Sequence, residues 1–104
     1  MLLKLGHANA TVTTSGTRVP LKASKTVVRS IMIQANQANT DKIYIGASTV
    51  SSSSYGAVLT AGNSLTIEAP QMGIGGANDL DLSEIYVDAG VNGEGVSVIY
   101  LYRN

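Results

Sequence analysis

Asp41–Gly46 reads Asp-Lys-Ile-Tyr-Ile-Gly, and a related segment, Ser83–Asp88, reads Ser-Glu-Ile-Tyr-Val-Asp. In each segment one tyrosine stands between two aliphatic residues. The tyrosines are Tyr44 and Tyr86, and their aliphatic neighbours are Ile43, Ile45, Ile85 and Val87. Because successive side chains of a β-strand point to opposite faces, this spacing predicts two related strands that turn aliphatic residues toward a core and a tyrosine toward the opposite surface.

The length and charge of the chain limit the kinds of protein it can be. It has 104 residues and a mass of 10.8 kDa, which fits one domain with a single core. Charged residues make up 13% of the chain, compared with roughly 25% in an ordinary soluble domain. Its seven basic and seven acidic residues balance, whereas a nucleic-acid-binding protein normally carries a basic surface. We therefore expect no nucleic-acid partner, and a charge-poor surface that favours association with other subunits.

Residue types that are absent also exclude several kinds of site. The chain contains no cysteine, so it forms no disulfide, zinc–thiolate site or thiol nucleophile. It lacks Phe and Trp, and its five aromatic residues are all tyrosine, so we expect a core built from Val, Ile, Leu, Met and Ala. The apolar run within Met1–His7 is too short for a signal peptide or a membrane span. This predicts a soluble chain that is made in a cytoplasm and has no membrane partner.

Alternating apolar residues mark further strands. Thr26–Asn36 is the longest candidate strand. Its residues on one face are Ile31, Ile33 and Ala35. A polar turn at residues 37–41 then leads into the Lys42–Gly46 strand, so we expect these two strands to form a hairpin-like unit.

The second half of the chain continues the pattern. Ser64–Ala69 alternates, and its predicted inward residues are Leu65, Ile67 and Ala69. The Asn92–Gly93 pair is a strong hairpin signal, and Val96–Tyr102 carries apolar residues on both faces, which favours a central position in a sheet or contact with another subunit. In total we expect about six to eight short strands at roughly 8–12-residue spacing, separated by glycine and polar turns. This predicts an all-β protein, a sandwich or barrel of antiparallel strands.

The first 25 residues follow the strand pattern less clearly. Thr11–Thr14 has strand propensity, and Arg18–Ala23 fits a short edge strand because Pro20 cannot donate a backbone hydrogen bond to a neighbouring strand. An arm that packs on a neighbouring subunit is also compatible with this segment. We expect residues 1–25 to form an N-terminal arm or edge strand, with attachment as one alternative role, and residues 26–104 to form the core β-domain.

No combination of residues points to catalysis or to a cofactor. His7 is the only histidine, it lies near the end of the chain, and no serine stands in a nucleophile-elbow pattern. Gly73–Asn78 departs from a dinucleotide-binding fingerprint, because Asn78 occupies the third glycine position and no helix is predicted to follow. We therefore expect no catalytic residues, no cofactor and no enzyme activity.

A group of acidic residues is the best candidate for binding a metal ion, and its pattern is poor. Its members are Asp79, Asp81, Glu84 and Asp88. The segment lacks the third acidic position and the glycine of an EF-hand loop. The better interpretation is a solvated approach to a strand, so we expect no metal site.

The tyrosines have three competing interpretations. Tyr44 and Tyr86 lie outside the predicted aliphatic face, where amphipathic aromatic side chains serve as interface anchors. Packing against neighbouring strands on a half-exposed sheet explains them about as well, and stacking on a sugar is the third alternative. Tyr55 adjoins the serine run Ser51–Ser54, a predicted surface loop, and would be the stacking residue of a ligand-binding protein.

Six segments follow one another in a recognisable order. They are Val27–Ala35, Asn39–Gly46, Val50–Gly56, Leu59–Leu65, Leu82–Ala89 and Asn92–Tyr100. The pattern runs from an aliphatic strand through Asn-x-x-x-Ile-Tyr-Ile-Gly, Val-Ser, Leu-x-x-Gly-x-Ser-Leu, Ile-Tyr-Val-Asp and Asn-Gly-x-Gly-Val to a final strand that contains tyrosine. Over residues 26–102 this order resembles a group of small structural proteins of tailed bacteriophages. The resemblance implies a single β-sandwich of jelly-roll type, used for capsid decoration (cement) or as a module of head fibres and tails.

The same resemblance implies a function and partners. We expect a non-enzymatic virion protein that binds the assembled capsid and stabilises it, located on the capsid surface and made in the cytoplasm of a bacterial host. Such proteins commonly sit on the capsid as trimers, so the expected partners are further copies of the chain and the major capsid protein or another virion protein. The residues expected at a subunit or capsid interface are Tyr44, Tyr86, Arg18 and Pro20. The alternative is a tail, baseplate or head-fibre module that binds a receptor or carbohydrate through Tyr55.

Overall fold

Nearly every regular element of the described chain is a β-strand. The computed structural model describes residues 3–68 and 79–103. The strands are β1 (Leu3–Val12), β2 (Val19–Pro20), β3 (Val27–Val28), β4 (Ser30–Ala35), β5 (Ile43–Gly46), β6 (Ala57–Leu59), β7 (Ser64–Glu68), β8 (Leu80–Asp81), β9 (Tyr86–Ala89) and β10 (Glu94–Arg103). The one helical element within these ranges is a short 3-10 turn, η1 (Leu82–Glu84). The predicted all-β class is confirmed. The strands outnumber the prediction because β3 and β8 are two-residue pairings, too short for an alternating pattern to reveal, whereas the short edge strand predicted within Arg18–Ala23 is β2.

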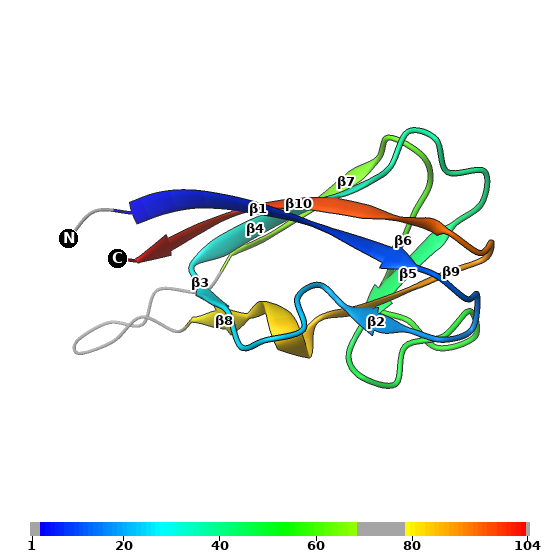
Figure 1. Ribbon diagram of the computed structural model, residues 1–104, viewed down its shortest axis with the longest axis horizontal. Coiled ribbons are helices and arrows are strands. Elements are labelled where there is room, and N and C mark those ends of the chain that lie inside the picture. The colour runs from blue at the N-terminus through cyan, green and yellow to red at the C-terminus, as the bar shows by residue number, and fades with distance from the viewer. Residues whose placement is uncertain (1–2, 69–78, 104) are drawn as a thin grey trace.

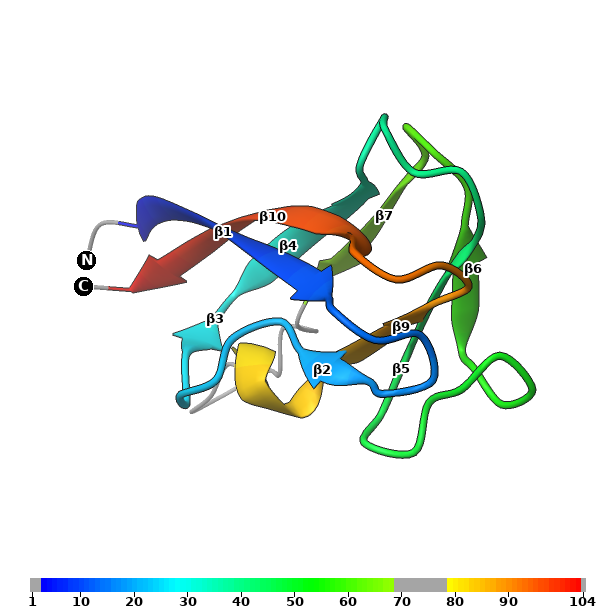
Figure 2. The same ribbon diagram turned by 45° about the vertical axis from the view of Figure 1, so that its right-hand side comes forward.

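Most of the strands belong to two four-stranded antiparallel sheets (Figure 1). The first sheet has the order β1-β10-β4-β7 and the second has the order β2-β9-β5-β6 (Figure 2). β3 and β8 form a separate short pair (Figure 1). The pairings of β5 with β6, β4 with β7, β3 with β8, β2 with β9 and β1 with β10 are nested around the β5–β6 connection. The chain therefore forms one long antiparallel hairpin, which the pairings of β10 with β4 and of β9 with β5 roll into two sheets.

The inner faces of the two sheets share one hydrophobic core. The predicted inward residues that the structure describes are buried or packed on this core: Ile31, Ile33 and Ala35 of β4, and Leu65 and Ile67 of β7. Ala69 lies outside the described residues. The buried core is aliphatic apart from Tyr100. Because full burial of a large aliphatic side chain contributes about 1.5–3 kcal/mol, this shared core holds the two sheets together.

The two segments that contain Ile-Tyr lie side by side at the centre of the second sheet. In β5, Ile43 and Ile45 are buried and Tyr44 lies on the opposite face, as the spacing predicts. β9 pairs antiparallel with β5, so that Tyr44 stands opposite Asp88 and Ile45 opposite Val87. The related sequences therefore form neighbouring strands of one sheet.

The prediction of one continuous strand over Ser83–Asp88 is wrong in its first half. That part contains most of η1, and β9 begins at Tyr86. Oδ1 of Asp81 accepts a hydrogen bond from the backbone N–H of Ser83 and another from the backbone N–H of Thr26, both at 3.0 Å. The bond to Ser83 caps the 3-10 turn and satisfies the Ser83 N–H, which would pair with a neighbouring strand if the segment were extended. The capped turn therefore forms in place of the predicted strand.

Neither predicted hairpin forms. β4 lies in the first sheet and β5 in the second, so residues 36–42 cross between the sheets. β9 and β10 also lie in different sheets, and the turn at Asn92–Gly93, with Gly93 at a φ of 84°, connects them. Local chemistry identifies a turn, but long-range pairing decides the neighbours of each strand. The predicted central position of Val96–Tyr102 is confirmed, because β10 lies between β1 and β4.

Residues 3–25 belong to the same folded unit as the rest of the described chain. β1 pairs with β10 along its whole length. Ala10, Val12 and Leu21 lie in the shared core. Pro20 of β2 lies opposite Tyr86 at an edge of the second sheet. A role of this segment in attachment stays a prediction, but its middle part is built into the fold.

Candidate interaction surfaces

The outer face of the first sheet changes from apolar to polar along its strands. In the antiparallel register, Leu5 of β1 lies beside Leu101 of β10, and Ser30 of β4 and Glu68 of β7 complete this row. The next row of outward residues contains His7, Ile99, Met32 and Thr66. The row after it contains Asn9, Ser97, Gln34 and Ser64. The aliphatic residues of these rows lie on β1, β10 and β4, toward the beginning of β1 and the end of β10, which lie at the same end of the described molecule (Figure 1).

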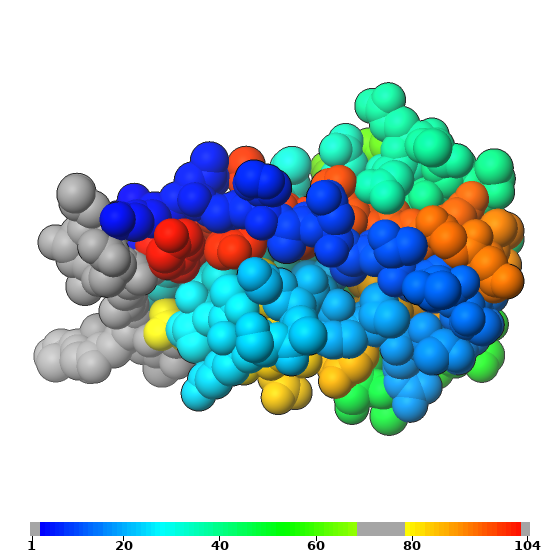
Figure 3. Space-filling model, viewed as in Figure 1, coloured from blue at the N-terminus to red at the C-terminus, as the bar shows by residue number. Residues whose placement is uncertain are grey.

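We name the apolar end of this surface the aliphatic face, defined as Leu3, Leu5, Met32, Ile99 and Leu101. Leu5 is 65% exposed, and Ile99 and Met32 are 39% and 37% exposed. All members except Leu3 line a shallow hollow whose surface is almost entirely apolar. In Figure 3, β1 (blue) and the C-terminal end of β10 (red) lie side by side at the surface. Exposed aliphatic side chains gathered in this way are typical of a protein–protein contact surface.

Close packing between β1 and β10 supports this face: the ring of Tyr100 lies against Gly6, and the backbone of β1 lies against Gly95. A Cβ atom at Gly6 would lie 2.5 Å from Cε2 of Tyr100, and one at Gly95 would lie 2.1 Å from the carbonyl oxygen of Ala10. Neither position accommodates a side chain without displacement of its neighbours. The two glycines therefore allow the close approach that sets the positions of Leu5 and Ile99.

A buried polar cluster fixes the beginning of β10. Oε2 of Glu94 accepts hydrogen bonds from the backbone N–H and the hydroxyl of Thr40 at 2.5 and 2.8 Å, and Oε1 accepts one from the N–H of Asp41 at 3.1 Å. The side-chain amide of Asn39 donates to the carbonyl of Gly95 at 2.9 Å. Burial acts to raise the pKa of Glu94, but the hydrogen bonds from Thr40 and Asp41 outweigh it and hold this pKa below its ordinary value. The ionised carboxylate therefore anchors the connection between β4 and β5.

The outer face of the second sheet carries a pair of tyrosines. The ring of Tyr44 lies 5.1 Å from that of Tyr55, centre to centre, with an angle of 41° between the ring planes. Tyr55 is 50% exposed, and Val58, which lies opposite Tyr44 on β6, is 42% exposed. The structure thus brings together a tyrosine predicted for a subunit contact and one predicted for ligand stacking.

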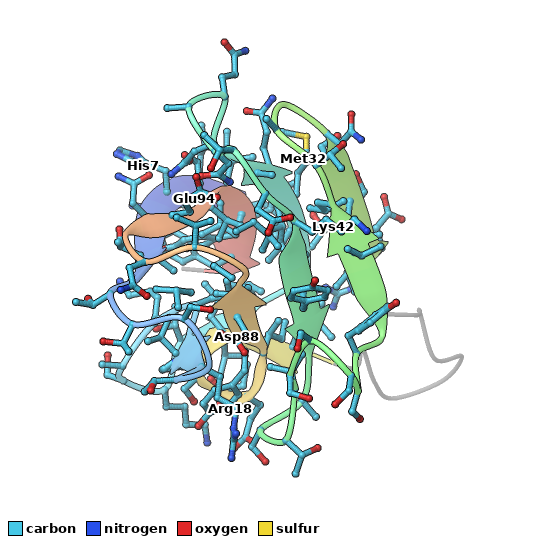
Figure 4. The ribbon with its side chains drawn as sticks, turned by 90° about the vertical axis from the view of Figure 1, so that its right-hand side faces the viewer. His7, Arg18, Met32, Lys42, Asp88 and Glu94 are labelled. Carbon is cyan, nitrogen blue, oxygen red and sulfur yellow. The ribbon has the colours of Figure 1, made fainter. Side chains whose placement is uncertain are left out.

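Arg18 and Tyr86 line a separate hollow. Its described lining residues are Gly16, Thr17, Arg18, Ser48 and Tyr86. The backbone N–H of Gly16 donates to Oδ1 of the buried Asp88 at 3.0 Å, which ties this turn to β9. Figure 4 shows Arg18 and Asp88 toward the same end of the view. With Pro20 opposite Tyr86, the structure groups three of the four predicted interface residues and leaves Tyr44 with Tyr55.

The ionisable residues considered for chemistry lie in structural roles or apart from one another. His7 is exposed on β1, opposite Ile99. The hydrogen bond from the Thr26 backbone lowers the pKa of Asp81 most, and Ser83 lowers it further against the opposite effect of burial. Within residues 3–68 and 79–103, no group of three or more His, Asp or Glu side chains is arranged to hold a metal ion.

Asp79 lies 3.9 Å from the guanidinium of Arg29. Glu84 is exposed on η1. Gly73–Asn78, predicted to be a loop, lies outside the described residues.

Sequence reasoning missed the aliphatic face. The local pattern places Met32 on the same face of its strand as Ser30 and Gln34, and it predicts no strand over Leu3–Leu5. The signal that pointed toward this surface was the apolar residues on both faces of Val96–Tyr102. The face becomes visible only when the register of β1, β10 and β4 places Leu5, Ile99 and Met32 near one another.

Comparisons with protein-family models, with curated proteins and with solved structures find no match to this chain. None of the described segments forms a helix long and apolar enough to cross a membrane.

Proposed function

We propose that this chain is a non-enzymatic structural protein of a tailed-phage virion, a capsid decoration protein that binds the assembled capsid and stabilises it. The observation that carries the proposal is the aliphatic face, where exposed leucine, isoleucine and methionine side chains gather at one end of a sheet surface. Such a surface suits docking on another protein. The order of motifs over residues 26–102 gives the class of assembly, because it resembles small phage structural proteins.

The strand arrangement supports a β-sandwich of jelly-roll type. A jelly roll consists of two packed antiparallel sheets made from eight strands. The orders β1-β10-β4-β7 and β2-β9-β5-β6, together with the nested pairing, are those expected when one long hairpin rolls up. Jelly rolls occur widely in viral capsid proteins. Because one fold serves many functions, this argument supports the proposal by analogy only.

The placement of the polar residues supports a role without catalysis. Oxygen atoms of Asp81, Asp88 and Glu94 accept hydrogen bonds from backbone N–H groups and so hold turns and connections in place. His7 lies on an exposed strand position. These groups stabilise the fold, and we assign none of them to a reaction.

Capsid stabilisation would follow from mass action. A small protein that binds the assembled shell, but not its free subunits, lowers the free energy of the assembled state. Burying an exposed leucine or isoleucine contributes up to about 1.5–3 kcal/mol, so one aliphatic face provides modest binding. Several linked copies would bind more tightly through avidity. We therefore include self-association in the proposal, and the trimer is the form that the resemblance implies.

Co-sedimentation with phage heads that lack decoration protein tests this function. The chain should bind heads saturably and raise the temperature at which they release DNA. Ile99→Glu places a charge at the centre of the aliphatic face and should reduce binding at least tenfold. Asn9→Glu places the same charge on the polar part of the same sheet surface and should bind like the unmodified chain. No binding to heads, or equal binding by both variants, would contradict the proposal.

A second candidate function has support from the tyrosine pair. Tyr55 is half exposed beside Tyr44, and aromatic rings with neighbouring hydroxyl groups are suited to stacking on a sugar. The chain would then be a tail, baseplate or head-fibre module that binds a receptor or carbohydrate. Binding to a glycan array that Tyr55→Ala abolishes, and that Ile99→Glu leaves unchanged, would favour this function over capsid decoration.

A further inference from the structure

The four edge strands of the two four-stranded sheets differ strongly in length. β2 has two residues, one of them Pro20, and β6 has three. β7 has five residues, whereas β1 runs over ten. Natural proteins usually shorten, interrupt or cover their edge strands, because an open edge pairs with other chains. β1 is the exception in this molecule.

The direction of the free backbone groups of β1 follows from the hydrogen bonds of β10. The carbonyl of Gly95 accepts a hydrogen bond from the N–H of Asn36, on the β4 side. Because antiparallel strands alternate their bonding direction, the odd-numbered residues of β10 bond to β4 and the even-numbered residues bond to β1. Their partners on β1 are the even-numbered residues, and the carbonyl of Val12 accordingly accepts from Gly93. The free N–H and C=O groups of β1 therefore belong to Leu3, Leu5, His7, Asn9 and Thr11.

The first half of this edge is the accessible part. Among the residues that the structure describes, no side chain or backbone group outside β10 forms a hydrogen bond with residues 3–11. Residues 19–23 share a hollow with the second half of β1, Ala8–Thr11, and Figure 1 shows β2 close to that half. The open edge thus consists of residues 3–7, where Leu3 and Leu5 are 53% and 65% exposed.

We propose that two copies of this chain associate through the edges of their β1 strands, antiparallel and around a two-fold axis. The edge is self-complementary, because the odd-numbered residues that present free N–H and C=O groups also share the outer face of the sheet. When odd-numbered residues of one copy pair with odd-numbered residues of the other, their free N–H and C=O groups bond to each other and the outer faces of the two sheets lie on the same side. The result is a continuous eight-stranded sheet, formed from the sheet β1-β10-β4-β7 of each copy.

The apolar side chains select a register centred on Leu5. Each Leu5 then lies opposite Leu5 of the second copy, and each Leu3 lies opposite His7. This arrangement gives about six backbone hydrogen bonds over the open segment. It also places Lys4 opposite Gly6, so that the only charged side chains of the segment do not face each other directly. The two aliphatic faces become neighbours on one side of the joined sheet.

The occupant of the edge is a second copy and not an unrelated strand because of this symmetry. Lys4 is the one charged residue in the open segment at neutral pH, so no charge pattern on the edge selects a different chain. A two-fold contact closes at two copies, so it predicts a dimer and not the trimer that the resemblance implies. The inference does not rest on the proposed function, since self-association is measured without heads.

Sedimentation equilibrium on the full chain tests the pairing. We expect a dimer of twice the 10.8 kDa chain mass. Leu5→Pro removes an edge-facing N–H without removing a bond to β10, so it should leave a folded monomer. Asn9→Pro removes an edge-facing N–H outside the open segment and should remain dimeric. Ile99→Glu should also remain dimeric, because Ile99 is on the aliphatic face but not on the edge.

A cross-link gives a second, independent readout that does not need a disruptive variant. The chain has no cysteine, so Leu5→Cys introduces a single thiol. Hydrogen-bonded antiparallel partners have Cα atoms about 5.5 Å apart, within the range that a disulfide spans. Mild oxidation should convert Leu5→Cys to a covalent dimer, whereas Thr66→Cys, on the opposite edge strand of the same surface, should form no covalent dimer. A monomer or trimer in sedimentation, an unchanged dimer in Leu5→Pro, or equal cross-linking of the two cysteine variants would overturn the pairing.

Discussion

Replacing Gly95 with alanine should destabilise the fold strongly, because no space exists for the added methyl group. The new Cβ atom would lie 2.1 Å from the carbonyl oxygen of Ala10 and 2.9 Å from Cα of Thr11. Both atoms belong to the backbone of β1, so a side-chain rotation cannot relieve the overlap. Relief requires β1 and β10 to separate, at a cost of about 1–3 kcal/mol by analogy with overpacked cores. For a domain near this size, each kcal/mol lowers Tm by about 4–8 °C.

Thermal unfolding followed by circular dichroism measures this effect. We expect Gly95→Ala to lower Tm by about 4–24 °C, which corresponds to about 1–3 kcal/mol. Gly56→Ala is the matched control, because its Cβ atom would meet only the carbonyl of Ile45 at 3.4 Å, an ordinary contact. Its Tm should change by less than about 3 °C, the effect of about 0.5 kcal/mol. If the two variants unfold at the same temperature, β1 and β10 are not packed as described.

Two further predictions concern the same fold. The pKa values of Glu94 and Asp81 lie below their ordinary values of 4.5 and 3.8. Both ionised carboxylates therefore stabilise the fold at a pH above these ordinary values, and the free energy of unfolding should fall as the pH drops below them and through the lowered pKa values. In urea unfolding at several pH values, Glu94→Gln should be less stable at neutral pH and lose less on acidification; an unchanged pH dependence would refute the role of this carboxylate. Ile33→Ala should cost about 2–5 kcal/mol because Ile33 is fully buried, whereas Met32→Ala on the exposed face should cost less than about 1 kcal/mol. Equal losses would show that the faces of β4 are assigned incorrectly.

Periodicity predicted the strands whose faces differ clearly in polarity. Ile31, Ile33 and Ala35 recur at every second position of β4 and identify its buried face, and Ile43 and Ile45 do the same for β5. Each of these strands has one buried and one outward face, and an alternating pattern in the sequence indicates a strand of this kind. The central position of β10 was also predictable, because both of its faces are apolar.

The partners of the strands could not be predicted from local sequence. The turn at Asn92–Gly93 exists, but it connects two sheets, because β10 pairs with β1 and β4 and not with β9. Asp81 likewise replaces strand pairing with a capped turn through bonds to Thr26, which is far away in the sequence. Both cases depend on contacts between distant segments.

The candidate surfaces were predictable in part. The outward position of Tyr44 followed from the spacing of its neighbours, but its contact with Tyr55 depends on how the loop after β5 folds back. The aliphatic face needs the register of three strands, because Leu5, Met32 and Ile99 come from distant parts of the sequence. One apolar residue on the outward side of a strand does not indicate an apolar surface until its neighbours on the adjacent strands are known.

A cryo-electron-microscopy map of an intact virion that contains this chain tests the proposed function most directly. The proposal predicts density for the two-sheet domain on the outside of the capsid, at sites between capsomers, with Leu5, Met32 and Ile99 against the shell. Density for the domain in the tail or baseplate would contradict the proposed function. Density on the capsid with the aliphatic face exposed to solvent and in contact with no other protein would also contradict it.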